Sequence, residues 1–211
     1  MRPKSEKKRR VKVGTVCMSA GAALVIAALC LFGFNQWEDR QAGLSVAEVL
    51  PQVMEIAQQD AEAEETGGTP VVSEASGTDM TEVMVEGYDY IGYLSIPSLS
   101  LELPVMSTWS YPQLRIAPCR YYGSTKTGDL VIAAHNYSRH FGNLKDLSVG
   151  DKLYFTDMDG TVTTYEVVEL DNLAPTAIEE MTSGGYALTL FTCTYSGQSR
   201  VTVRCDACAD S

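Results

Sequence analysis

The sequence contains little positive charge. Its 211 residues include 16 Lys and Arg against 27 Asp and Glu, which gives a formal net charge of -11. Because binding to nucleic acid requires a basic face, this composition argues against a nucleic-acid partner. The exception is the stretch 1–12, MRPKSEKKRRVK, in which seven residues are basic and one is acidic. An imbalance confined to one end of a chain calls for a local explanation.

Charged residues are absent altogether from Val13 to Trp37. About 20 apolar residues in a helix span the roughly 30 Å core of a bilayer. The basic residues before this run and the acidic residues after it favour a cytoplasmic N-terminus. A cleaved signal peptide is the alternative, but no A-x-A-like site follows the run. We therefore expect a cytoplasmic tail (1–12), a single-pass signal anchor (13–37) in the cell membrane, and an extracellular globular part.

Residues 38–87 are expected to form an acidic spacer. Apolar residues at helical intervals predict a short amphipathic helix around Val46–Glu64. The following TGGTPVVSEASGTDMTE has the composition of a flexible linker. We expect this spacer to hold the C-terminal domain away from the membrane.

From about Tyr88 onward, the sequence consists of short runs of residues that are typical of β-strands. They include YIGYLSIPSL, LELPVM, GDLVIAAH and the hairpin KLYFTDMDGTVTTYEVVEL, whereas PTAIEEM predicts one or two turns of helix. Seven or eight short strands with little helix predict a mainly β domain, a closed β-barrel with one or two short helices, over 88–211.

Histidine is also scarce, since the chain contains only His135 and His140. The CDAC motif (Cys205–Cys208) has the spacing of zinc and redox sites, but zinc would need two more ligands and no βαβ pattern surrounds the motif. A local disulfide or two unreactive thiols are the readings left open. The DMDG stretch (157–160) lacks the ligand spacing of a calcium loop and is interpreted as a turn. We expect no metal and no cofactor.

The last hairpin brings two reactive side chains together. In ALTLFTC, Thr189, Phe191 and Cys193 share one face because side chains alternate along a strand. If the hairpin closes symmetrically, Cys193 pairs with Arg200 and the two side chains lie on the same face. Arg204 is the other arginine of this strand but lies further from the thiol. Thr192, on the opposite face, is a weaker candidate for substrate contact.

A cysteine nucleophile needs a proton carrier, and His135 is positioned for this role. It ends the apolar strand GDLVIAAH, whereas His140 lies further into a polar loop and is the second candidate. A positive neighbour favours the thiolate, and arginine can donate hydrogen bonds to an oxyanion. Cys193, His135 and Arg200 together supply a nucleophile, an acid/base and an oxyanion donor.

Four motifs in the same order resemble those of sortases, the membrane-anchored cysteine transpeptidases of mainly Gram-positive bacteria. TLFTC matches the T-L-x-T-C signature, SRVTVR the segment with the arginine, GDLVIAAHN the strand with the histidine, and IGYLSIPSLSLELPV the start of the barrel. Ala134 stands where many members have glycine. HNYSRHFGNLKDL leans toward a class B-like sortase, although the helical insertion of that class is longer than APTAIEEMTSGG.

The resemblance implies a mechanism and partners. Cys193 would cleave the Thr–Gly bond of an LPxTG-like sorting signal and form a thioester. His135 would move the proton, and Arg200 would stabilise the oxyanion. The partners would be the sorting-signal peptide of a secreted protein and an amine of a peptidoglycan precursor or a pilin. Three alternatives remain open: hydrolysis alone, a non-enzymatic surface module, and thiol–disulfide exchange at Cys205 and Cys208.

Overall fold

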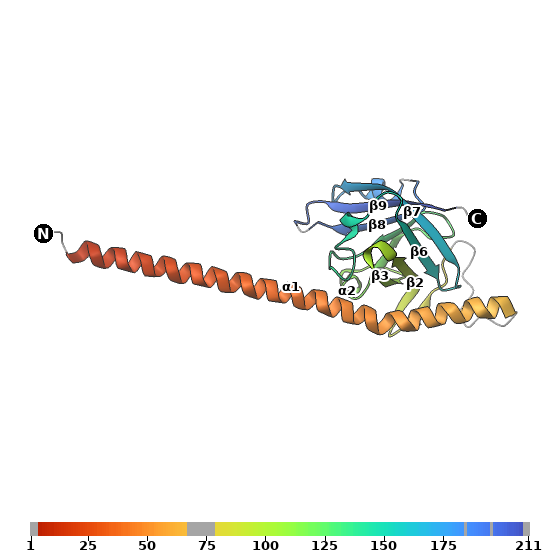
Figure 1. Ribbon diagram of the computed structural model, residues 1–211, viewed down its shortest axis with the longest axis horizontal. Coiled ribbons are helices and arrows are strands. Elements are labelled where there is room, and N and C mark those ends of the chain that lie inside the picture. The colour runs from red at the N-terminus through yellow and green to blue at the C-terminus, as the bar shows by residue number, and fades with distance from the viewer. Residues whose placement is uncertain (1–3, 67–78, 184, 195, 209–211) are drawn as a thin grey trace. The chain divides into compact units, whose positions relative to one another are not determined.

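The computed structural model describes residues 4–66, 79–183, 185–194 and 196–208, with only the backbone described for 4–13 and 60–66 (Figure 1). Most of the predicted linker sequence, 67–78, lies outside the described residues. By its internal contacts the chain divides into two compact units, Met1–Arg40 and Gln41–Ser211.

The first unit consists of the N-terminal part of helix α1, whose bounds are Lys4–Thr66. Side chains 14–37 are exposed along their whole length and are mainly apolar. Within the described part of the chain, α1 is the helix long and apolar enough to cross a membrane, by length and composition. A helix satisfies its own backbone hydrogen bonds, as a membrane segment must. The predicted orientation across the membrane stays a prediction.

The second unit is a closed β-barrel. Its strands pair in the order β2-β3-β4-β5-β8-β9-β7-β6, and β6 pairs again with β2. The pairs β3–β4 and β5–β8 are parallel and the others are antiparallel. These eight strands confirm the predicted barrel. The barrel strands are β2 (Tyr88–Ile96), β3 (Leu101–Met106), β4 (Cys119–Tyr122), β5 (Leu130–Ala133), β6 (Lys152–Asp157), β7 (Val162–Leu173), β8 (Leu188–Cys193) and β9 (Arg200–Ala207). The short strand β1 (Val83–Val85) pairs with β2.

Short helices fill the connections between strands, as expected. They are the 3-10 turns η1 (Pro97–Leu99) and η2 (Leu144–Asp146), and the helices α2 (Tyr111–Leu114) and α3 (Ile178–Thr182). Ser110 caps α2 by accepting a hydrogen bond from the Gln113 amide. This bond satisfies one of the amide donors that a helix N-terminus leaves unpaired.

The barrel closes where β2 meets β6, and a glycine makes this possible. Gly92 has a φ of +143°, and a Cβ there would lie 2.1 Å from the Thr156 carbonyl oxygen. The pairing of β2 with β3 also shifts register between Tyr90 and Gly92. Such bulges bend a strand and increase its twist, as a closed barrel requires.

The second part of α1 packs on the outside of the barrel. Val49, Val53 and Ala57 recur every four residues and are buried in one cluster with Tyr90 and Met106. This spacing places them on one face of the helix. The helix expected around Val46–Glu64 is therefore part of α1, and the first half of the expected spacer contributes to the domain's core.

The CDAC motif is not a disulfide. Cys205 and Cys208 are both free, and residues three apart on an extended chain point to opposite sides. Cys205 is fully buried in the barrel core, where desolvation raises the pKa of its thiol to about 12. Cys208 lies near the Lys152 ammonium, with its Sγ 3.1 Å from Nζ. Of the two readings left open, the structure has the free thiols.

Candidate active site

The β8–β9 hairpin has the predicted register. Cys193 lies opposite Arg200, Thr192 opposite Val201, and Phe191 opposite Thr202. Directly opposed residues of an antiparallel pair have Cα atoms roughly 4.5–5.5 Å apart and side chains on the same face. Both Cys193 and Arg200 are partly exposed. The thiol and the guanidinium therefore share the accessible mouth of one hairpin.

The connecting loop holds the two strand ends together. The Thr194 amide donates to the Ser199 carbonyl (3.0 Å), and the Ser199 amide donates to Thr194 Oγ1 (3.2 Å). The Arg200 guanidinium donates two long bonds, to the carbonyls of Gly197 (3.3 Å) and Ser199 (3.4 Å). These weak bonds leave the side chain able to turn toward a substrate.

His135 reaches the same place through a strand pair distant in sequence. Strands β5 and β8 run parallel, with Ala133 opposite Phe191. The Ala134 amide donates to the Phe191 carbonyl (3.2 Å). His135 lies two residues beyond Ala133, past the end of β5, so a register continued over these two residues would place it level with Cys193 and on the same face. Because β8 lies between β5 and β9, this continued register would place His135 and Arg200 on opposite sides of Cys193.

On the opposite face of β8, the Thr192 side chain connects this strand to the residue that follows β5. Its hydroxyl is buried and donates to the Ala134 carbonyl at 2.9 Å, which ties β8 to the residue before His135. Its predicted contact with substrate stays a prediction. His140, the second histidine candidate, has no exposed surface and packs against the Tyr137 ring. Burial keeps His140 out of reach of a peptide, whereas His135 is partly exposed.

Arg204 has a structural position. It is buried and donates to the carbonyls of Glu180 (2.7 Å) and Met181 (3.3 Å) and to Thr189 Oγ1 (3.2 Å). Its guanidinium also lies 5.1 Å from the centre of the Tyr186 ring. At about 3.3 Å per residue, four residues place Arg204 roughly 13 Å along β9 from Arg200. The hydrogen bonds of Arg204 hold α3 against the barrel.

A line of aromatic rings leads away from Cys193 across the barrel surface. The Phe191 ring contacts Tyr121 at 5.2 Å between ring centres, Tyr121 contacts Trp109 at 5.4 Å, and Trp109 contacts Tyr111 at 6.0 Å. Phe191 lies two residues before Cys193 and therefore on the same face. Trp109 and Tyr111 are exposed. The line offers an apolar path on the side of the hairpin that carries the thiol.

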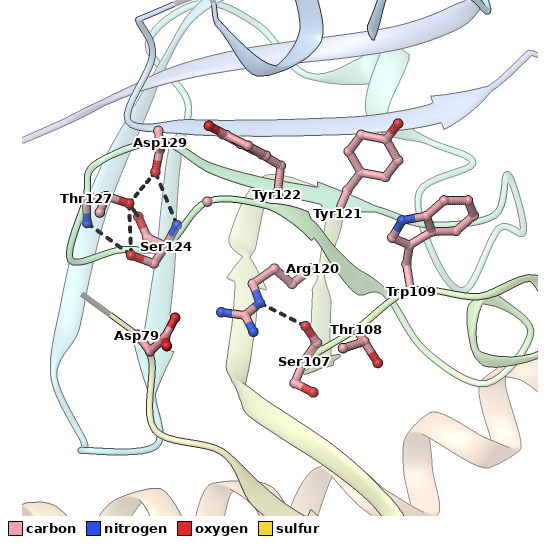
Figure 2. A pocket seen from close by; sticks show the side chains of 11 residues that line it. Asp79, Ser107, Thr108, Trp109, Arg120, Tyr121, Tyr122, Ser124, Thr127 and Asp129 are labelled. Carbon is pink, nitrogen blue, oxygen red and sulfur yellow. Dashed lines mark hydrogen bonds between the residues drawn. The ribbon is translucent and has the colours of Figure 1, made fainter. Parts of the chain in front are cut away.

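A pocket of about 550 Å³ opens beside this line (Figure 2). Trp109 and Tyr121 lie at one end of the view, and a hydrogen-bonded cluster of Ser124, Thr127 and Asp129 lies at the other. Between them, Arg120 donates to the Ser107 carbonyl (2.8 Å) and pairs with Glu82 outside the pocket (2.9 Å). The lining is Asp79, Ser107, Thr108, Trp109, Arg120, Tyr121, Tyr122, Gly123, Ser124, Thr127 and Asp129.

The acidic DMDG stretch forms a turn between β6 and β7. One Asp157 oxygen accepts the amides of Asp159 (3.1 Å) and Thr161 (2.9 Å), and Asp159 pairs with Lys126 (3.2 Å). Burial raises the pKa of the Asp157 carboxyl. The protein's own donors thus occupy these carboxylates. Across the described ranges, no three His, Cys, Asp or Glu side chains gather as metal ligands.

Sequence reasoning did not identify the aromatic line or the pocket. Trp109, Tyr121 and Phe191 come from three separate segments, which only the β3–β4, β4–β5 and β5–β8 pairings bring together. A local pattern of hydrophobicity contains no signal for such a contact.

Comparisons with known proteins identify the family of the domain. Residues 94–208 match the family model of the sortase domain. The chain is 32% identical over 124 residues to sortase A of Bacillus anthracis, a match that covers 54% of this chain and 59% of that protein. The chain thus spans less than two thirds of this relative.

Solved structures of sortases have a similar fold. Sortase C1 from Streptococcus suis is 28% identical, with a TM-score of 0.50 over 58% of this chain and 74% of that one. Sortase A from Corynebacterium diphtheriae is 20% identical, with a TM-score of 0.53 over 86% and 96%. Sortase C from Streptococcus pneumoniae is 19% identical, with a TM-score of 0.53 over 78% and 96%.

These neighbours are sortases C and A, and they do not support the class B-like assignment to which the HNYSRHFGNLKDL stretch pointed. At identities under 25%, the second and third likenesses concern the fold alone. The match of the family model over more than half of the sequence shows the membership: the chain belongs to the sortase family.

Proposed function

We propose that this protein is a membrane-anchored cysteine transpeptidase that cleaves an LPxTG-like sorting signal and transfers the acyl part to an amine. The observation that carries the proposal is the paired register at the mouth of β8. Cys193 lies opposite Arg200 on one side, and the parallel β5 strand leads to His135 on the other.

The first half of the reaction forms a thioester. The Cys193 sulfur attacks the carbonyl carbon of the Thr–Gly bond, and Arg200 donates hydrogen bonds to the oxygen that becomes negative. The C–N bond then breaks while His135 donates a proton to the departing glycine amine. The products are a peptide with a new amino terminus and an acyl group on the thiol.

The second half transfers this acyl group. A primary amine attacks the thioester carbonyl, and His135 accepts the proton that the amine loses. The C–S bond breaks and the sulfur leaves as thiolate, so that a new amide is formed and the enzyme returns to its starting state. We propose a peptidoglycan precursor or a pilin lysine as the source of the amine.

The aromatic line supplies a binding path for the donor peptide. Phe191 and Tyr121 present apolar surface next to Cys193, and Trp109 continues it. Apolar residues before the scissile bond can pack there, since binding grooves combine apolar walls with a few polar groups. Tyr121→Ala should therefore raise the KM for the donor peptide more than it lowers kcat.

The proposed localisation follows from the order of the segments. The apolar part of α1 is the single membrane span, with the basic residues 1–12 in the cytoplasm. The barrel then works on the outer side, where secreted proteins and wall precursors meet.

The test uses the full chain in detergent with an LPxTG-containing peptide, alone and with an added amine. Triglycine represents a peptidoglycan cross-bridge and Nα-acetyl-lysine represents a pilin lysine. We expect a new amide product with one of these amines, detected by mass spectrometry. Release of free acid alone would support a hydrolase instead.

Two cysteine variants form a matched pair for this assay. Cys193→Ala should abolish cleavage, whereas Cys208→Ala should leave it unchanged, since Cys208 lies outside the site. Cleavage that survives Cys193→Ala would contradict the proposal.

A further inference from the structure

The loop that follows β5 carries His135 and is closed by several backbone hydrogen bonds. The His135 carbonyl accepts the Phe141 amide (3.2 Å), and the Tyr137 carbonyl accepts the amides of His140 (3.0 Å) and Gly142 (2.9 Å). A Cβ on Gly142 would lie 2.7 Å from both the Asn136 and Tyr137 carbonyl oxygens. The backbone therefore turns back on itself too closely to admit a side chain at this position.

The same loop is anchored on two sides. Phe141 and His140 have no exposed surface, and Phe141 belongs to the core inside the barrel. On the outside, Arg139 lies against α1, where a Cβ on Gly43 would come within 3.0 Å of its Cγ. A loop fixed at the core and braced by a helix is a rigid support for a side chain at its start.

Tyr137 lies between the two imidazoles of this loop. Its ring centre is 5.0 Å from that of His135, with 44° between the planes, and 5.5 Å from that of His140, with 58°. Both distances fall in the range of favourable aromatic pairs. Of these two rings, that of His140 is fully buried and that of His135 is partly exposed. The Tyr137 ring therefore contacts both the buried imidazole of His140 and the accessible imidazole of His135.

We propose that Tyr137 is a positioning residue for His135 and that the packing of its ring helps to hold the imidazole toward Cys193. This inference rests on the proposed function, in which His135 exchanges a proton with the substrate amine. Proton transfer requires heavy atoms about 2.6–3.2 Å apart, and a displacement of about 1 Å can lower a rate roughly 100-fold. Without this ring contact, the imidazole would spend less time in the reactive rotamer.

The experiment compares variants of Tyr137 in the full chain in detergent. Tyr137→Phe keeps the ring and should retain kcat within about twofold. Tyr137→Leu removes the ring and should lower kcat roughly 100-fold, with the donor-peptide KM within about threefold, because the donor path lies on other strands. Tyr154→Leu on β6 is the matched control and should leave both constants unchanged. Tyr137→Met provides a second ringless variant if the leucine variant does not fold.

A second readout does not depend on activity. The chain contains two histidines, so ¹³C-labelled histidine gives two sets of ring signals, assigned with the His135→Ala variant. The His135 signal should move in Tyr137→Leu and stay in place in Tyr137→Phe. Equal kcat in the wild type and Tyr137→Leu, or an equal loss in Tyr137→Phe and Tyr137→Leu, would overturn the inference. If the wild type cleaves no sorting peptide, the proposed function fails, while the histidine signals still test the contact.

Discussion

Two arginines of β9, four residues apart on the same face, should have separable roles. Arg200 lies opposite Cys193 at the open end of the hairpin, whereas Arg204 is buried under α3. Replacing each in turn with methionine keeps an unbranched side chain and removes the charge. We predict that Arg200→Met abolishes most activity with little change in stability. Arg204→Met should lower the stability and leave peptide cleavage by the folded protein close to the wild-type rate.

The magnitudes follow from the contacts of each side chain. Arg204→Met leaves two buried acceptors, Thr189 Oγ1 and the Met181 carbonyl, without their donor. An unsatisfied buried group costs about 1–3 kcal/mol. The third acceptor of Arg204, the carbonyl of the exposed Glu180, can bind water instead. For the two groups together we expect a loss of about 2–6 kcal/mol in the free energy of unfolding, or roughly 4–24 °C in Tm.

Arg200→Met should change stability by less than about 0.5 kcal/mol, because its bonds of 3.3 and 3.4 Å are long and partly exposed. Loss of one oxyanion donor typically lowers kcat about 100- to 1000-fold. Both variants are measured by urea unfolding and by peptide cleavage. The reasoning fails if Arg204→Met loses activity at unchanged stability, or if Arg200→Met cleaves the peptide at the wild-type rate.

Three further predictions concern the hairpin loop, the barrel seam and the thiols. A glycine inserted after Gly197 should lower peptide cleavage at least tenfold and change Tm by less than about 4 °C, since it slips Cys193 relative to Arg200; unchanged cleavage would refute the register argument. Gly92→Ala should reduce the free energy of unfolding by about 3 kcal/mol or more, because its methyl group would meet a backbone carbonyl, while Gly128→Ala, with open space around it, should lose only about 1 kcal/mol in the same urea titration. Iodoacetamide at pH 8 should label Cys193 well before Cys119 and Cys205, because burial raises the pKa of both thiols to about 12 and keeps them protonated until the pH approaches that value; peptide mapping that found rapid labelling of Cys119 in the folded protein would contradict this.

The parts of the site that the sequence predicted are local ones. Cys193 and Arg200 are seven residues apart, and the alternation of side chains along two strands joined by a short loop determines which residues face each other. The barrel class was predictable for a similar reason, since several strands end at a recognisable turn or proline, as β2 does before Pro97 and β6 before the turn at Gly160.

The parts that escaped prediction depend on long-range pairing. Residue periodicity places His135 at a strand end, but the parallel β5–β8 pairing that leads the chain toward Cys193, 58 residues away, gives no local signal in the sequence. The buried Thr192 hydroxyl bonds to a carbonyl across the same pair. The packing of Val49 and Val53 on the barrel likewise needs the folded surface that receives them.

The contact of Tyr137 with His135 is local in sequence but still depends on how the loop folds. The residues are two apart in sequence, but their rings meet only because the loop turns back sharply before Gly142. The sequence places His140 in a polar loop, and the composition of a loop does not indicate which of its rings come into contact.

The most direct test of the account is to trap the covalent intermediate. The full chain is mixed with the LPxTG-containing peptide, without an amine, and quenched in acid after a fraction of one turnover. We predict a mass increase equal to the acyl fragment, located on the peptide that contains Cys193 and removed by hydroxylamine, as a thioester requires. Peptide cleavage with no adduct on Cys193, or with the adduct on another residue, would contradict the account.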